Sequence, residues 1–146
     1  MKVFENPLLL YAKMFLAEIR SWRKSYIAPN WVCTHFAKEI FDAATSRGIR
    51  CGYTIITFTN QQSHALITFD TDYGLIYFEP QSGEQTEVAV GKPYRGVEDI
   101  LTETFIAAIQ TVWNDEDEVK FLRCPNCEYL TPIFCPNCGE HKIVIE

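Results

Sequence analysis

The sequence predicts an α+β fold in which N-terminal helices pack on an antiparallel sheet, followed by a small cysteine-rich unit. Hydrophobic residues recur at helical spacing up to Gly48 and alternate with a period of two from Arg50 onward. Two Cys-x-x-Cys pairs lie near the C-terminus. With 146 residues and 47% hydrophobic content, the chain can bury one core and carry a small appendage. The acidic run at residues 114–118 separates a core of residues 1–114 from an appendage of residues 119–146.

Two helices are expected before the sheet. Residues 7–25 carry apolar side chains at helical spacing. A second helix follows Pro29, with Asn30 as a good N-cap, and ends at Gly48, a natural C-cap. Cys33 then lies in the first turn, where the helix N-terminus favours a thiolate and its N–H groups can hold an oxyanion. A free cysteine is more often a small buried hydrophobe, so a nucleophilic role for Cys33 depends on its partners.

Four strands and a further helix should follow. The expected strands cover residues 50–58, 64–70, 75–79 and 85–90. Residues 97–113 predict a third helix, because their apolar residues recur at helical spacing and acidic residues begin the segment. Cys51 in the first strand has no acid, base or second cysteine near it in sequence, so we interpret it as a packed thiol.

A thiolate hydrolase needs a histidine beside the sulfur and a group that orients that histidine. The chain has three histidines. His141 lies in the appendage, and His35 would project to a different helix face from Cys33. His64 is the remaining candidate.

The hairpin that follows His64 supplies its orienting group. With the turn centred between Thr71 and Asp72, Glu79 stands directly opposite His64. If the register moves by one residue on each side, Gln81 takes that place and Glu79 becomes a diagonal neighbour on the same face. Asp72 itself is expected to form the turn. The alternative interpretation is a surface histidine across from a surface glutamate.

These residues resemble a known family. The matching residues are Cys33-Thr34-x-Phe36-Ala37, Gly48-Ile49, His64-Ala65 at the start of a strand and Glu79-Pro80 at the end of the next. Over roughly residues 28–95 they are similar to the core of the transglutaminase-like, papain-like cysteine hydrolase superfamily. The resemblance implies Cys33 as nucleophile, His64 as general base and acid, and Glu79 as the orienting acid where the family usually has aspartate. Such families include transglutaminases, proteases, amidases and inactive scaffolds, so the fold alone does not choose the reaction.

The appendage carries two Cys-Pro-Asn-Cys turns separated by seven residues, with the cysteines Cys124, Cys127, Cys135 and Cys138. Four thiolates at this spacing favour a tetrahedral, structural zinc site with no open position. We therefore expect a zinc ribbon that holds one zinc ion, with short strands at residues 120–123 and 142–145. A rubredoxin-like iron site is the alternative.

Charge and hydropathy limit the function classes. The N-terminal apolar run is interrupted by Glu5, Lys13 and Glu18, which predicts neither a signal peptide nor a membrane span and points to a cytoplasmic protein. A net charge of −6 without a basic run gives little support to nucleic-acid binding. The expected activity is hydrolysis of an amide or isopeptide bond in a peptide or protein. The alternative is an inactive scaffold that binds a protein partner through the zinc ribbon.

Overall fold

The computed structural model describes residues 3–23, 33–60, 63–80, 82–94 and 104–116, together with the backbone of residues 122–123 and 130–131. The side chains of residues 20–23 and 33–35 are outside this description. The predicted Asn30 cap, Gln81 and the four cysteines of the predicted ribbon also lie outside the described residues.

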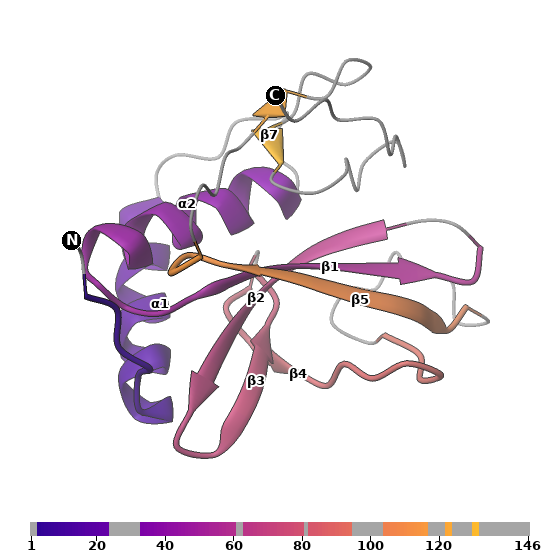
Figure 1. Ribbon diagram of the computed structural model, residues 1–146, viewed down its shortest axis with the longest axis horizontal. Helices are drawn as coiled ribbons and strands as arrows, with labels where there is room; N and C mark the ends of the chain where they lie inside the picture. Colours follow the sequence, from indigo (N-terminus) through magenta and orange to yellow (C-terminus); the bar gives the residue numbers. More distant parts are fainter. Residues whose placement is uncertain are drawn as a thin grey trace.

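Two helices pack on a five-stranded antiparallel open sheet, which confirms the predicted α+β class. The helices are α1 (Leu9–Arg23) and α2 (Cys33–Ser46). The strands are β1 (Gly52–Phe58), β2 (Ser63–Thr71), β3 (Gly74–Phe78), β4 (Gln85–Thr86) and β5 (Ile106–Trp113), in the spatial order β4-β3-β2-β1-β5. A separate antiparallel pair joins β6 (Leu122–Arg123) to β7 (Leu130–Thr131), and β7 contacts α2 (Figure 1).

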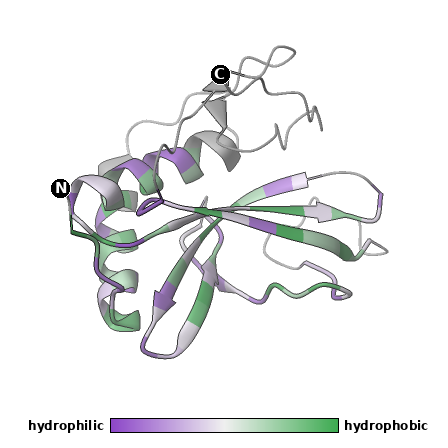
Figure 2. Ribbon diagram, viewed as in Figure 1, coloured by the Kyte–Doolittle hydropathy of each residue, from purple (hydrophilic) through white to green (hydrophobic). Residues whose placement is uncertain are grey.

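The main core lies between the helices and one face of the sheet. Because side chains alternate along a strand, Ala65, Ile67 and Phe69 of β2 all point to this face. Hydrophobic residues run along α1 and the central strands in Figure 2. From the helices the core receives Ala12, Phe15, Leu16, Ile19, Ala37, Ile40, Phe41 and Ala44.

A second, smaller core covers part of the opposite face. It contains Ile56 and Phe58 of β1, Leu66 of β2, Ile106 of β5 and the loop residue Tyr94. The central strands β1 and β2 are therefore buried on both faces, which explains their nearly continuous apolar sequence. This second face carries the candidate site.

The predicted third helix is wrong over residues 104–113. Ile106–Trp113 forms strand β5, which pairs antiparallel with β1, so that Ile109 lies opposite Ile56. Isoleucine, threonine, valine and tryptophan suit a half-buried pleated surface, and pairing with β1 overrides the helical spacing of the apolar residues. Residues 97–103 lie outside the description. The expected strand at residues 85–90 has only two paired residues, Gln85 and Thr86.

Helix α1 receives its N-terminal cap from a distant turn. The N–H of Leu9 donates to Oδ1 of Asp72 at 2.7 Å, in the hairpin between β2 and β3. Gly74 closes that hairpin with a φ of 90°, a left-handed conformation that glycine adopts without strain. Asp72 was expected only to form the turn, and it also fixes the start of α1 on the sheet.

Asn114 directly follows β5 and joins this strand to the end of α2 and the start of β1. Its Oδ1 accepts from the N–H of Cys51 at 2.9 Å, and its Nδ2 donates to the carbonyl of Ile49 at 2.9 Å and to Oγ1 of Thr45 at 3.1 Å. The Oδ1 and Nδ2 atoms of Asn114 therefore hold the end of α2 against the start of β1.

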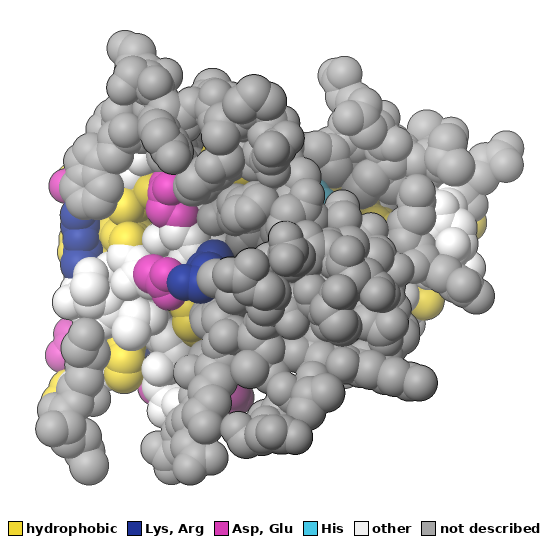
Figure 3. Space-filling model, turned by 90° about the horizontal axis from the view of Figure 1, so that it is seen from above, with side chains coloured by type: hydrophobic (Ala, Val, Ile, Leu, Met, Phe, Trp, Pro, Cys, Tyr) yellow, Lys and Arg dark blue, Asp and Glu magenta, His cyan; other side chains and the backbone are white. Residues whose placement is uncertain are grey.

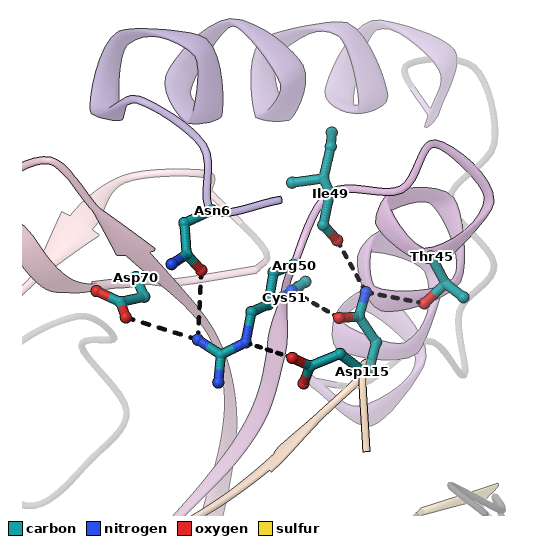
Figure 4. Close-up of polar contacts among 8 residues, drawn as sticks. Asn6, Thr45, Ile49, Arg50, Cys51, Asp70 and Asp115 are labelled. Carbon is teal, nitrogen blue, oxygen red and sulfur yellow. Dashed lines mark hydrogen bonds and ion pairs between the residues drawn. The ribbon is translucent and has the colours of Figure 1, made fainter. Parts of the chain in front are cut away.

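Arg50 connects three segments that are far apart in the sequence. Its guanidinium donates to Asp115 at 2.8 Å and to Asn6 at 3.3 Å, and lies 3.6 Å from Asp70 (Figure 4). It also stacks 4.1 Å from the centre of the Trp113 ring. Figure 3 shows basic side chains directly beside acidic ones on the face of the molecule seen from above. In the described part of the chain, neither helix has the length and hydrophobicity of a membrane span.

Candidate functional site

His64 lies at the start of β2 and is nearly buried, with 8% of its surface exposed. Its Cα partner on β1 is Ile56, a member of the second core. The imidazole lies 5.4 Å from the ring of Tyr94, centre to centre. The His64 side chain therefore belongs to the sheet face opposite the helices.

Glu79 follows directly after β3 and is 1% exposed. A tight turn fixes its backbone: its N–H donates to the carbonyl of Glu84 at 2.8 Å, and its carbonyl accepts from the N–H of Gly83 at 2.7 Å. Gly83 has a φ of 75°, which a residue with a side chain adopts only with strain. The turn directs the carboxylate back over the second face of the sheet.

The hairpin brings these two residues into contact. Oε1 of Glu79 meets Nε2 of His64 in a buried hydrogen bond. Thr68 pairs with Tyr77 and Thr71 with Gly74, so the hairpin adopts the second of the two registers considered from the sequence. In this register Glu79 is a diagonal neighbour of His64 on the same face, and its longer side chain spans the diagonal.

Tyr94 is the third member of the buried cluster, and no sequence pattern pointed to it. Its hydroxyl donates to the same Oε1 of Glu79 at 2.9 Å, and only 4% of the residue is exposed. It lies in a loop, where burial leaves no periodic pattern that could have identified it. The preceding Gly91 and Pro93 are typical of a turn, so the sequence around Tyr94 predicts a loop.

Cys33 is the first residue of α2. The helix has 14 residues and is about 21 Å long, and β1 has seven residues and is about 23 Å long. The two run in opposite directions in Figure 1, so α2 begins at the end of the sheet where β1 finishes and β2, with His64, begins. The Cys33 side chain lies outside the described residues.

Cys51 is the other cysteine of the core, and it is packed as predicted. It has 0% exposure and lies in the main core. Burial raises the pKa of the Cys51 thiol far above its ordinary range, because the apolar surroundings disfavour the charged thiolate. A thiol that stays protonated is a poor nucleophile.

Glu79 also lines a cavity of about 860 Å³. Tyr77, Glu84, Glu87 and Lys92 contribute to its wall, between β3 and the segment that follows β4. The acid of the His64–Glu79 pair therefore forms part of the cavity wall.

The described residues contain no group of three or more histidine, cysteine or acidic side chains arranged to hold a metal ion. The four predicted zinc ligands are outside the description. Arg123 of β6 pairs with Leu130 of β7, so the two ends of the segment carrying Cys124 and Cys127 lie together.

Comparisons of the chain with models of known protein families, with curated proteins and with solved structures find no significant match.

Proposed function

We propose that the protein is a cysteine-nucleophile hydrolase with a transglutaminase-like core, a protease or amidase that cleaves an amide or isopeptide bond in a peptide or protein. Cys33 would be the nucleophile, His64 the general base and acid, and Glu79 the group that orients His64. The observation that carries the proposal is the buried contact between His64 and Glu79.

A buried histidine–carboxylate pair supports acid–base chemistry for two reasons. The carboxylate fixes the ring orientation and stabilises the imidazolium that forms when the histidine accepts a proton. The low exposure of both residues keeps water from weakening this interaction. A pair at the surface, the alternative considered from the sequence, would lack that protection.

The nitrogen of His64 that bonds Glu79 determines which nitrogen would transfer protons during catalysis. Because Nε2 of His64 faces Glu79, Nδ1 would take the proton from the Cys33 thiol. The thiolate would attack the substrate carbonyl, and the N–H groups at the start of α2 would hold the oxyanion. The same Nδ1 would then give its proton to the leaving amine, and water would hydrolyse the thioester.

The sheet restricts the direction of approach. The His64 side chain belongs to the face opposite α2, whereas Cys33 begins α2. The proposed site therefore requires the thiol to meet the imidazole at the end of the strands, where β1 finishes and β2 starts. Substrate would enter from that same end.

The C-terminal unit is proposed to be a zinc ribbon at residues 119–146. Cys124, Cys127, Cys135 and Cys138 would hold one structural zinc ion. The paired strands β6 and β7 support the first half of this arrangement. The ribbon would also offer a docking surface for a protein partner, and the cytoplasmic location stays a prediction from the sequence.

Alkylation by iodoacetamide tests the proposed nucleophile. The zinc-loaded protein is treated from pH 5 to pH 8, and adducts on each cysteine are read by mass spectrometry of peptides. We expect Cys33 to react faster than a free thiol at the acidic end, and the replacement His64→Gln to remove that excess. Cys51 serves as an internal control, because its buried thiol should not react in the folded protein.

The opposite result would favour the other candidate function. If Cys33 reacts no faster than a free thiol at any pH in this range, the activated nucleophile is excluded. The chain would then be an inactive scaffold of the same fold that binds a protein through its C-terminal unit.

A further inference from the structure

Tyr94 contacts both members of the His64–Glu79 pair. Its hydroxyl donates to Oε1 of Glu79 at 2.9 Å, the same oxygen that meets Nε2 of His64. Its ring lies 5.4 Å from the imidazole at an angle of 43°, and 6.4 Å from the ring of Phe58. The hydroxyl and the ring thus restrain the carboxylate and the imidazole together.

Main-chain hydrogen bonds fix Tyr94 to the sheet. The N–H of Gly91 donates to the carbonyl of Ile106 at 2.8 Å, and the N–H of Ile106 donates to the carbonyl of Lys92 at 2.8 Å. Ile106 begins β5, and β5 pairs with β1, which pairs in turn with the strand of His64. The loop therefore has a defined position relative to the histidine, as a preorganised site requires.

The long side chain of Glu79 explains why such a restraint is needed. Glutamate has one more rotatable bond than aspartate, so its carboxylate loses more conformational freedom when it is held in a single orientation. A phenolic hydroxyl is a donor at neutral pH, and a bond to one oxygen removes that freedom while leaving the oxygen's second lone pair for His64.

We propose that Tyr94 is a positioning residue of the site, whose hydroxyl holds the Glu79 carboxylate in the orientation in which Oε1 accepts from Nε2 of His64. Its relevance to catalysis rests on the proposed hydrolase function. Its effect on the His64–Glu79 hydrogen bond does not, and can be measured by itself.

The test is the replacement Tyr94→Phe, which keeps the ring and removes only the hydroxyl. The matched control is Tyr53→Phe, the same change at a buried tyrosine on the helix-covered face. The first measurement is the NMR resonance of the His64 Nε2–H proton, assigned by its loss in His64→Gln. The position of this proton downfield reports how strong the hydrogen bond to the carboxylate is.

We expect Tyr94→Phe to move the resonance upfield, toward its position in Glu79→Gln, and Tyr53→Phe to leave it unchanged. If Tyr94 instead only competes for the carboxylate, removing its hydroxyl strengthens the remaining bond and moves the resonance downfield. A downfield shift or no shift overturns the proposal. In the Glu79→Gln background, Tyr94→Phe should have no further effect, and a full effect there also overturns it.

The second measurement is the rate of Cys33 alkylation. Tyr94→Phe should lower the excess reactivity about two- to tenfold, because a positioning residue passes on only part of the free energy of its hydrogen bond to the carboxylate. Thermal unfolding of both tyrosine variants shows whether the fold is retained. If His64→Gln leaves the alkylation rate unchanged, the hydrolase function fails, and the NMR comparison still decides the role of Tyr94.

Discussion

At the scale of single residues, the site depends on where one carboxylate oxygen lies. Oε1 of Glu79 meets His64 and Tyr94 inside a region from which water is nearly excluded. Burying a carboxylate is costly unless hydrogen bonds compensate it, and two donors on one oxygen supply that compensation. The family that the sequence resembles usually has aspartate at the position of Glu79. In this chain the glutamate there receives a supporting hydrogen bond from Tyr94.

Cys51 makes stability depend on pH in the alkaline range. Its pKa is raised by burial in the folded state and returns to an ordinary value, about 8.5, on unfolding. The folded state then binds more protons above that pH, so the free energy of unfolding falls as pH rises. We expect Cys51 to contribute a slope of about −1.4 kcal/mol per pH unit above pH 8.5.

Denaturant unfolding from pH 7 to pH 10.5 measures this slope, and Cys51→Ala is the comparison. The variant is less stable throughout, because it loses buried volume. Its free energy of unfolding should fall less steeply with pH than that of the parent chain. Parallel curves for the two proteins would show that Cys51 ionises equally in both states.

At the scale of elements, α1 takes its first cap from the β2–β3 hairpin. The N–H of Leu9 donates to Asp72, 63 residues away in sequence. An N-cap normally comes from the residue just before the helix, so this bond also joins α1 to the sheet. The same carboxylate suits the partial positive charge of the helix N-terminus.

Asp72→Ala should therefore lower the free energy of unfolding by about 1 kcal/mol. Asp72→Asn, which keeps an acceptor oxygen, should lose only a few tenths of a kcal/mol, from the charge. Urea denaturation of the three proteins measures the difference. Equal losses for alanine and asparagine would mean that the hydrogen bond contributes nothing.

Asn114 has the larger effect expected of a buried polar residue. Asn114→Ala leaves the N–H of Cys51 and the carbonyl of Ile49 without their partner, at a cost of about 2–4 kcal/mol. The exposed neighbour Glu116→Ala should stay within about 0.5 kcal/mol of the parent chain. Chemical denaturation tests both, and a loss under 1 kcal/mol at Asn114 would contradict this account.

At the scale of the whole molecule, the two cores lie within residues 12–106, in the part of the chain before the predicted ribbon. If the four C-terminal cysteines bind metal, the chain should contain one zinc ion per molecule, and a strong chelator should remove it. We expect the sheet to survive chelation, because the buried residues that form its two cores in the described part of the chain all lie between residues 12 and 106.

Elemental analysis measures the zinc, and circular dichroism before and after chelation follows the sheet. Replacement of Cys124 and Cys127 by serine should abolish tight zinc binding, since two thiolates are lost. Replacement of Cys51 by alanine should leave the zinc content unchanged. Collapse of the sheet on chelation would show that the C-terminal unit is required to keep the core folded.

Local pattern was sufficient for much of the fold. The two helices and the first three strands follow from periodicity, because the 3.6-residue and two-residue repeats are set by the backbone itself. It was insufficient for residues 104–113, whose apolar spacing suits a helix but which pair with β1 as a strand. Strand formation depends on a partner far away in sequence, and no local pattern specifies that partner.

The sequence by itself determined which residues are candidates. Elimination among the six cysteines and three histidines left Cys33 as the candidate nucleophile and His64 as the candidate base. The alternation of side chains along the strands put Glu79 on the face of His64 in either register. Only the tertiary structure decided that this face is the one opposite the helices, and that Tyr94 donates to the carboxylate. The reason is physical: periodicity determines which side chains share a face, whereas burial and loop contacts depend on which segments pack against that face.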